Sequence, residues 1–274
     1  MTSALRSAPP DVQLLRRDLR SGGVLILTLA RPQARNALSI GMLDALSAAF
    51  AEIAADRSVR VVVLAAEGPA FSSGHDLKEI TAARTAADKG RAFFEDTLSR
   101  CAAMMSQIVA LPQPIIAAVE GIASAAGCQL VATCDLAIAG DKAQFCTPGV
   151  NIGLFCSTPM VALSRNLSRK HAMEMLLSGD MFDAQEAARF GLVNRVVAAG
   201  GALEAALALA EKIASKSALT VKIGKRAFYE QAEMKLADAY AHTSRVMVEN
   251  LLARDADEGI SAFVQKRPPT WEDR

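Results

Sequence analysis

The sequence predicts an α/β fold in which mostly parallel strands alternate with helices. Short apolar runs rich in Val, Ile and Leu recur along the chain, and turn residues and helical patterns follow them. Two of the turns, 70–79 and 121–129, have the same composition: a strand end runs into Ser, Ala or Gly residues that lead into a helix. We therefore expect a buried sheet with two similar tight corners at its strand ends.

Apolar, β-branched runs locate the strands, and polar caps locate the first helix. We expect strands at residues 24–29, 59–66, 115–119 and 136–139. Ser39 is placed to cap a helix whose apolar side chains fall on one face, namely Leu43, Leu46, Phe50 and Ile53. This order of strand, turn, helix and strand is typical of units with parallel pairing.

The second half of the chain predicts more helices and a domain boundary. A helix is expected over 92–109, after a polar, alanine-rich segment at 81–91 that we predict to be a mobile cover. From residue 201 onward the pattern is helical, with Ala- and Leu-rich faces suited to subunit packing. We expect three segments: a flexible tail (1–20), an α/β core (21–200) and a C-terminal helical region (201–274).

Composition limits the possible functions. At 274 residues, with 51% hydrophobic and 22% charged residues, the chain suits one globular domain with an appendage. The net charge of +1 argues against a general nucleic-acid binder, which needs a basic surface. No apolar run approaches the ~20 residues that a membrane-spanning helix needs, so no membrane partner is expected.

The cysteines and histidines argue against a metal site. The five cysteines show no C-x-x-C spacing, and four lie among apolar or small residues, as reduced buried thiols do in a cytosol-like compartment. The three histidines lack the spacing of zinc ligands. The first ten residues contain no acid and could form a weak mitochondrial leader, but Asp11 and Asp18 follow soon. We expect a cytoplasmic protein, or one of the mitochondrial matrix if the source is eukaryotic.

The two corners predict a site that binds an oxygen atom. In the first, A-F-S-S-G-H-D-L-K-E, small residues allow the backbone to approach a ligand, and Asp76 is placed to cap the next helix. The second, G-I-A-S-A-A-G-C-Q, repeats this arrangement. Helix starts carry free N–H groups and a positive dipole end. If the corners face each other, they present two N–H donors to one oxygen, which is the architecture of an oxyanion hole.

Several motifs in order resemble one family over about residues 20–272. They are R-P-x-x-x-N-A-L-S, F-S-S-G-H-D-L-K-E, G-I-A-S-A-A-G-C-Q-L, C-D-L-A-I-A, A-Q-F-C-T-P and S-G-D-M-F-D-A-Q-E-A-A-R-F-G-L-V. The chain resembles the crotonase superfamily, the enoyl-CoA hydratase/isomerase family. The resemblance implies a spiral of ββα units with a C-terminal helical trimerisation segment. It also implies a homotrimer or a dimer of trimers that acts on acyl-CoA thioesters, with coenzyme A as part of the substrate and no permanently bound cofactor.

The resemblance also implies roles for individual residues. The backbone N–H groups of Ser73 and Ala126 would form the hole for the thioester oxygen. Ser73, Gly74, His75 and Asp76 would line the path of coenzyme A. In F-V-Q-K-R-P-P-T-W, Lys266 would reach a CoA phosphate in a neighbouring subunit, or it would be a solvated charge like most lysines in a tail.

The catalytic pair of the family hydratases is missing from this chain. Those enzymes use two glutamates, and the matching positions here are Gln129 and Gly149. Glutamine has no titratable proton and glycine has no side chain. General acid–base catalysis contributes ~10²–10⁴-fold, so the loss of both groups should nearly abolish ordinary hydration.

His75 offers an alternative source of chemistry, because histidine titrates near neutral pH. A histidine in this loop also occurs in family members that decarboxylate methylmalonyl-type CoA thioesters. Alternatively, His75 only bonds the backbone near Asp76. Cys156 and its neighbours could line the acyl end, but no partner base for a nucleophilic Cys156 is evident.

Two classes of function therefore remain open from the sequence. The first is an acyl-CoA enzyme that stabilises a CoA enolate, with weak hydratase, isomerase or decarboxylase activity. The second is an acyl-CoA-binding pseudoenzyme that keeps the hole for recognition only. Gln129 and Gly149 favour the pseudoenzyme, whereas the two donors and His75 favour the enzyme.

Overall fold

The larger of two sheets organises the molecule. The computed structural model describes residues 13–274, and the structural statements below concern that part of the chain. The six strands lie in the order β1 (Leu15–Leu19), β2 (Val24–Leu29), β3 (Val61–Ala66), β5 (Ile115–Val119), β7 (Leu136–Gly140) and β10 (Arg195–Val197). All neighbours pair in parallel except β1, which is antiparallel to β2. The buried, β-branched strands of this parallel sheet match the strands expected from sequence.

A smaller sheet runs beside the first. Its order is β4 (Ala70–Ser72), β6 (Ile122–Ser124), β8 (Gln144–Cys146) and β9 (Phe182–Asp183). Along the chain, β3 is followed by β4, β5 by β6, and β7 by β8, and helical segments connect the pairs. Each turn thus adds one strand to each sheet, which confirms the predicted spiral of ββα units.

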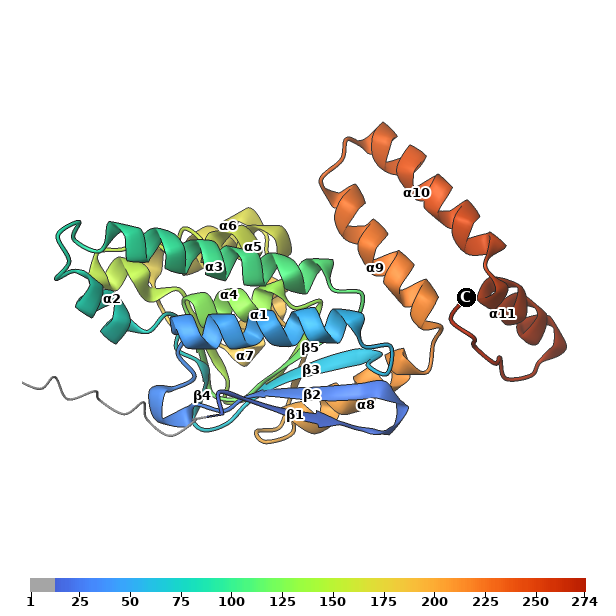
Figure 1. Ribbon diagram of the computed structural model, residues 1–274, viewed down its shortest axis with the longest axis horizontal. Coiled ribbons are helices and arrows are strands. Elements are labelled where there is room, and N and C mark those ends of the chain that lie inside the picture. The colour runs from blue at the N-terminus through green and yellow to red at the C-terminus, as the bar shows by residue number, and fades with distance from the viewer. Residues whose placement is uncertain (1–12) are drawn as a thin grey trace, which may run out of the picture.

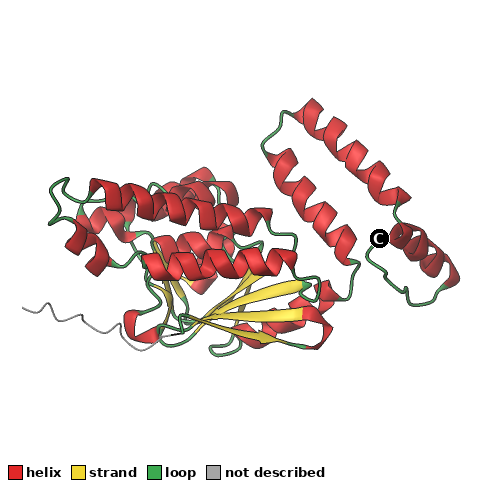
Figure 2. Cartoon of the chain, in the orientation of Figure 1, coloured by secondary structure: helices red, strands yellow, loops and turns green. Residues whose placement is uncertain are grey.

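Helices cover both faces of the larger sheet (Figures 1 and 2). On one side lie α1 (Ile40–Ala55), α2 (Leu77–Ala83), α3 (Arg91–Ala110), α4 (Ala126–Thr133), α5 (Pro159–Asn166), α6 (Arg169–Ser178) and α7 (Ala184–Phe190). The buried face of α1 is the predicted one, and Ser39 accepts a hydrogen bond from the Met42 N–H (3.3 Å). On the opposite face, α8 (Ala202–Ala214) buries three alanines against β2, β3, β5 and β7.

Two predicted boundaries need correction. The sequence predicts a tail that reaches residue 20, but Leu15–Leu19 form β1, so the core begins before residue 21. Residues 1–12 of the predicted tail lie outside the described residues. Because α8 packs on the sheet, the core also extends beyond residue 200 and ends at Ala214. We call residues 13–214 the body.

Glu120 explains why α8 starts where it does. Its carboxylate accepts a hydrogen bond from the Ala202 N–H (3.0 Å) and lies against Gly140, where a Cβ would be 2.3 Å from one carboxylate oxygen. A carboxylate at a helix N-terminus satisfies a free N–H and complements the dipole. Glu120 therefore links the end of β5 to α8.

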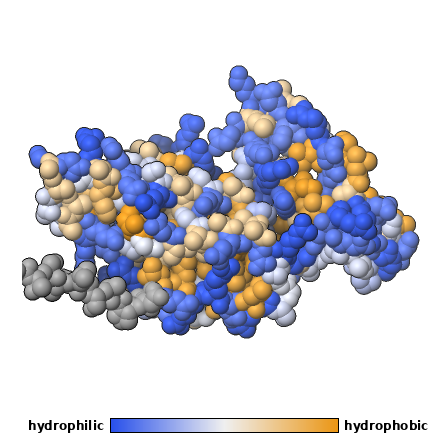
Figure 3. All heavy atoms as spheres, viewed as in Figure 1, coloured by the Kyte–Doolittle hydropathy of each residue, from blue (hydrophilic) through white to orange (hydrophobic). Residues whose placement is uncertain are grey.

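The remaining helices form an arm that projects from one end of the body (Figure 1). We call α9 (Ala218–Ala232), α10 (Leu236–Leu252) and α11 (Arg254–Gln265) the arm. Within it, only Ala227, Ala239, Asp255 and Ala262 are buried. Large apolar side chains are exposed, such as Leu252 (77%) and Phe263 (85%), and Figure 3 shows apolar surface on the arm as well as on the body. Within residues 13–274, no helix combines the length and the apolar character that a bilayer crossing requires.

Candidate functional site

The two predicted corners meet because their strands are neighbours. β4 and β6 pair in parallel, so the loops that follow them leave the same edge of the smaller sheet. A Cβ at Gly127 would lie 2.2 Å from the Ser72 carbonyl oxygen, and one at Gly74 would lie 3.1 Å from the Ala126 nitrogen. A side chain would clash at Gly127 and would be strained at Gly74, where φ is 85°, so glycine at both positions allows the two backbones to come into direct contact.

The second corner exposes the N–H of Ala126. Ala125 has φ 49° and ψ −117°, a conformation that L-residues rarely adopt. The Ala125 N–H donates to the Cys146 carbonyl (2.9 Å), which anchors this strained residue to β8. Ala126 begins α4, and its N–H donates to no protein acceptor among residues 13–274. Such strain at a helix start is typical of functional sites.

The first corner offers His75 rather than Ser73 as the donor. The Ser73 N–H donates to the Arg35 carbonyl (3.0 Å), and the Gly74 N–H donates to the Ser72 hydroxyl (3.3 Å). The His75 N–H follows directly and has no acceptor within the described part of the chain. The Ser73 hydrogen is already used inside the protein, so the free N–H of this corner is that of His75 and not the expected one of Ser73.

The side chain of His75 is largely buried between this corner and α1. Its Nδ1 lies 3.4 Å from the Leu38 carbonyl oxygen, and Nε2 is buried without a partner among residues 13–274. Burial lowers the pKa of His75, while the Leu38 carbonyl and the charge of Glu79 act in the opposite direction. The ring is therefore neutral at pH 7, and the Leu38 contact assigns the proton to Nδ1, which leaves Nε2 as an acceptor.

Asp76 is held on both carboxylate oxygens. It caps α2 by accepting from the Lys78 N–H (3.0 Å), as predicted, and its second oxygen accepts from Arg31 (3.1 Å). These contacts fix the end of the corner. Contact of Ser73, Gly74, His75 or Asp76 with coenzyme A stays a prediction.

Asn36 supports the first corner and was not singled out from the sequence. It is fully buried with φ 50°, and its amide donates to the carbonyls of Glu67 and Ala70 (both 2.9 Å). The backbone carbonyl of Asn36 accepts a hydrogen bond from the Ser72 hydroxyl (2.9 Å). A signal was present: asparagine tolerates the left-handed region better than most residues and is common where a turn must be fixed.

Comparison with known proteins decides the family. The family model for enoyl-CoA hydratase/isomerase matches residues 20–274. The chain belongs to the enoyl-CoA hydratase/isomerase family.

Among relatives in this family, the chain is 46% identical to the rat protein named enoyl-CoA hydratase domain-containing protein 3, mitochondrial, over 98% of this chain and 88% of the relative. The human protein of that name is 48% identical over 91% of this chain and 80% of the relative. A solved structure of an enoyl-CoA hydratase from Mycobacterium smegmatis matches with TM-score 0.90 and 50% identity, covering 94% and 98% of the two chains. The structure of human enoyl coenzyme A hydratase domain-containing protein 3 matches with TM-score 0.89 and 45% identity, covering 94% and 100%. These structures share the crotonase fold described above.

Gln129 and Gly149, which the resemblance matches to the two glutamates of the family, differ in their surroundings. Gln129 lies in α4 on the turn that begins with Ala126, is 5% exposed, and has a buried Oε1 without a partner within residues 13–274. Gly149 lies in a short 3-10 turn (Pro148–Ile152) after β8. A Cβ there would be 2.9 Å from both Cys156 Sγ and the Leu154 carbonyl oxygen. The space for a side chain at position 149 is therefore filled by the loop that ends at Cys156.

Restoring the glutamates should not restore a hydratase. We expect the double variant Gln129→Glu with Gly149→Glu to hydrate crotonyl-CoA no faster than the unmodified protein, because a side chain at position 149 has no room beside Cys156 and Leu154. Overpacking of this kind costs about 1–3 kcal/mol of stability. The rate of crotonyl-CoA hydration and the free energy of unfolding are measured for each variant. Gly153→Ala is the control, since nothing lies within 4 Å of a Cβ at Gly153. A rise in hydration to the level of an ordinary hydratase would contradict the prediction.

The cysteines do not supply a nucleophile at neutral pH. All five are free and buried. Burial raises the pKa of Cys156, although a hydrogen bond from the Gly149 backbone acts in the opposite direction. Among the described residues, no group of three or more side chains is placed to hold a metal ion.

Lys266 is remote from the corners of its own chain. It ends α11 with φ 52° and is exposed. In Figure 1, α11 and α2 lie at opposite ends of the molecule, and α2 begins directly after His75 and Asp76. Contact between Lys266 and coenzyme A therefore requires a second subunit and stays a prediction.

Proposed function

We propose that the protein binds acyl-CoA thioesters and stabilises their enolate form at the facing corners. The observation that carries this proposal is the pair of free backbone donors, His75 N–H and Ala126 N–H, on two corners in contact within the described part of the chain. When a bond at the α-carbon breaks and leaves its electron pair, negative charge develops on the thioester oxygen. Two fixed N–H groups at a helix start stabilise that charge in the transition state, which is usually the largest catalytic term in such chemistry.

The identity of the reaction follows from which proton-transfer groups remain. Gln129 and Gly149 supply no general acid or base, so the proposed enzyme is an atypical or weak hydratase, isomerase or lyase of its family. Decarboxylation of a malonyl- or methylmalonyl-type thioester suits the site, because CO₂ leaves its electron pair on the α-carbon and only the resulting enolate then needs a proton. The neutral His75 ring brings no proton on Nε2 at pH 7, so the proton for the enolate comes from water, and Nε2 as an acceptor can hold that water molecule in place.

The alternative function is an acyl-CoA-binding pseudoenzyme. The filled space at Gly149 favours this alternative, because it leaves no room for a side chain that could activate a water molecule. In this case the two N–H donors serve recognition of the thioester carbonyl only.

Assembly and location complete the proposal. The exposed apolar side chains of the arm support a homotrimer or a dimer of trimers, in which Lys266 would meet the coenzyme A of a neighbour. Coenzyme A enters as part of the substrate, with no permanently bound cofactor. We place the protein in the cytoplasm, or in the mitochondrial matrix if the source is eukaryotic, as the relatives named mitochondrial suggest.

One experiment separates enzyme from binder. Purified protein is incubated with a short enoyl-CoA, malonyl-CoA and methylmalonyl-CoA, and product and thermal shift are followed together. We expect His75→Ala to retain binding, because the donor is a backbone N–H, but to lose turnover. The lowered pKa keeps the His75 ring neutral at pH 7. Turnover that uses Nε2 as acceptor should therefore fall only when the pH drops below 6.5, the ordinary pKa of histidine.

The other outcomes are equally informative. Crotonyl-CoA hydration that is rapid and survives His75→Ala would contradict the assignment of Gln129 and Gly149. Binding without turnover across the panel would support the pseudoenzyme. Absence of any thioester binding would overturn both functions.

A further inference from the structure

The arm is joined to the body mainly by polar contacts. Its helices bury very little apolar surface, as described above, so hydrophobic packing does not explain why it holds its position. Besides the exposed pair Arg165–Glu233 (3.1 Å), two polar clusters make the connection. One is the pair Lys225–Asp135, between α9 and the start of β7. The other is formed by the last residues of the chain, Thr270–Arg274.

The last residues run back from α11 to the link between α8 and α9. The Trp271 indole Nε1 donates to the Ser215 carbonyl (2.9 Å), and the ring lies against Gly259, where a Cβ would be 3.2 Å from it. Asp273 accepts from the Ala218 N–H at the start of α9 (2.7 Å). These contacts join the end of the chain to a link more than fifty residues earlier in the sequence.

Arg60 ties the same segment to the body. It lies just before β3, and its two terminal guanidinium nitrogens donate to the Asp273 carboxylate at 2.9 and 3.4 Å. Its Nε donates to the Ala214 carbonyl (2.9 Å), and Nη2 also donates to the Lys216 carbonyl (2.6 Å). One side chain of the body therefore holds both the α8–α9 link and the C-terminal segment.

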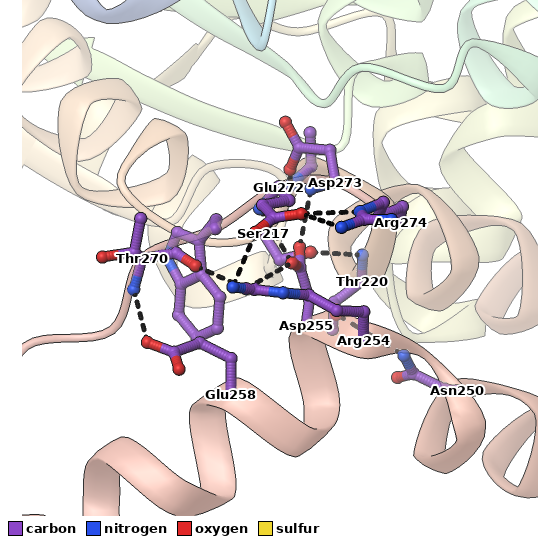
Figure 4. Close-up of polar contacts among 12 residues, drawn as sticks. Ser217, Thr220, Asn250, Arg254, Asp255, Glu258, Thr270, Glu272, Asp273 and Arg274 are labelled. Carbon is purple, nitrogen blue, oxygen red and sulfur yellow. Dashed lines mark hydrogen bonds and ion pairs between the residues drawn. The ribbon is translucent and has the colours of Figure 1, made fainter.

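Asp255 is the centre of this cluster. Its side chain is fully buried at the start of α11, and it accepts hydrogen bonds from the backbone N–H groups of Glu272 (2.8 Å) and Asp273 (3.0 Å). The hydroxyl of the buried Ser217 is a further donor, and Figure 4 shows these groups converging on the carboxylate. A buried carboxylate is stable only when donors surround it, so Asp255 requires the C-terminal segment to be in place.

Neighbouring contacts reinforce this arrangement. Arg254 binds the Thr270 carbonyl (2.7 Å) and the Glu272 carboxylate (2.7 Å). Glu258 holds Arg267 through two hydrogen bonds (2.7 and 2.9 Å) and accepts from the Thr270 N–H (2.8 Å). The turn between α11 and the C-terminal segment, which includes Lys266, is thereby fixed on one side of α11.

We propose that Thr270–Arg274 acts as a clasp that locks the arm onto the body, with Asp255 as the group that closes it. Arg60 and the α8–α9 link form the half of the clasp on the body, and α11 forms the half on the arm. When the clasp opens, α10 and α11 lose their fixed position relative to the body of their own chain, while the body stays folded. This inference does not depend on the proposed ligand.

The clasp carries its own reporter, because Trp271 is the single tryptophan of the chain. We expect Asp255→Asn to shift the Trp271 emission to longer wavelength and to raise its quenching by acrylamide, since an amide presents an NH₂ group to N–H donors. Hydrogen exchange at Glu272, Asp273 and Ala218 should accelerate about tenfold or more, because these amides lose their fixed acceptors. Exchange in β3 and β5 should stay as in the unmodified protein.

Two further variants make the test sharp. Asp257→Asn is the matched control, since Asp257 is an exposed acid in the same turn of α11 and its side chain makes no hydrogen bond or ion pair with residues 13–274. Arg60→Met opens the clasp from the side of the body, and we expect the same spectral and exchange changes as for Asp255→Asn. The double variant should add little to either single one, because both break one coupled network.

Several results would overturn the clasp. One is an unchanged Trp271 emission and unchanged exchange at Glu272 and Asp273 in both Asp255→Asn and Arg60→Met. Another is that, in both variants, hydrogen exchange in β3 and β5 accelerates as much as exchange at Glu272 and Asp273. That result would show that the arm and the body unfold together. If Asp257→Asn changed the Trp271 emission and the exchange rates as much as Asp255→Asn does, the changes would reflect loss of charge in general and not opening of the clasp.

Discussion

Gly74→Ala is expected to weaken thioester binding while leaving the protein folded. The added methyl group would lie 3.0 Å from the Ser124 carbonyl oxygen and 3.1 Å from the Ala126 nitrogen, between the two facing corners. One hydrogen bond to a neutral carbonyl contributes about 0.5–1.5 kcal/mol, so we expect the affinity for the thioester to fall by up to about tenfold. Isothermal titration with an acyl-CoA and with free CoA measures the thioester-specific part.

The control for this variant is Gly153→Ala. Both glycines have positive φ (85° and 76°), so both substitutions carry the backbone strain of about 1 kcal/mol. Only Gly74 has neighbours within 4 Å of the new methyl group. Wild-type affinity in Gly74→Ala, or an equal loss in Gly153→Ala, would show that the facing corners do not bind the carbonyl.

Lys225→Met is expected to cost about 3–5 kcal/mol of stability, because it leaves a buried carboxylate without its counterion. Lys225 Nζ lies 2.7 Å from Asp135 and also donates to the carbonyls of Ile108 (3.0 Å) and Gln113 (3.1 Å). The side chains of the pair are 7% and 14% exposed. Chemical unfolding measures the loss.

Two companions define the origin of this loss. Arg226→Met, on an exposed site of the same helix, should change stability by less than about 0.5 kcal/mol. Adding Asp135→Asn to Lys225→Met should recover part of the loss, because it removes the unpaired charge but keeps an oxygen for the Ile115 N–H, which lies 2.7 Å from the Asp135 carboxylate. No recovery in the double variant would mean that lost packing, rather than the buried charge, explains the effect.

Much of the fold was predictable because its signals are local. The parallel strands are short apolar runs, and the cap at Ser39 and the corner at Asp76 are set by neighbouring residues. The first strand escaped prediction because Leu15–Leu19 is an edge strand whose central residues are charged and exposed. A pattern search for apolar runs cannot find such a strand.

The site was predictable in outline but not in its atoms. The sequence places two small-residue corners after neighbouring strands, yet the choice between Ser73 and His75 depends on the Arg35 carbonyl, which a distant turn brings to the first corner. The filling of the space at Gly149 by Cys156 is likewise a contact across a loop. Asp255 resembles an ordinary solvated acid in the first turn of a helix until the chain end folds over it.

In the proposed site, main-chain atoms and side chains have separate tasks. The proposed recognition of a carbonyl at His75 and Ala126 would use main-chain atoms, which most side-chain replacements that keep the glycines leave in place. Proton transfer in the family depends on side chains at two other positions, 129 and 149. Under the proposed function, substitution at positions 129 and 149 would change the reaction while the class of ligand is kept.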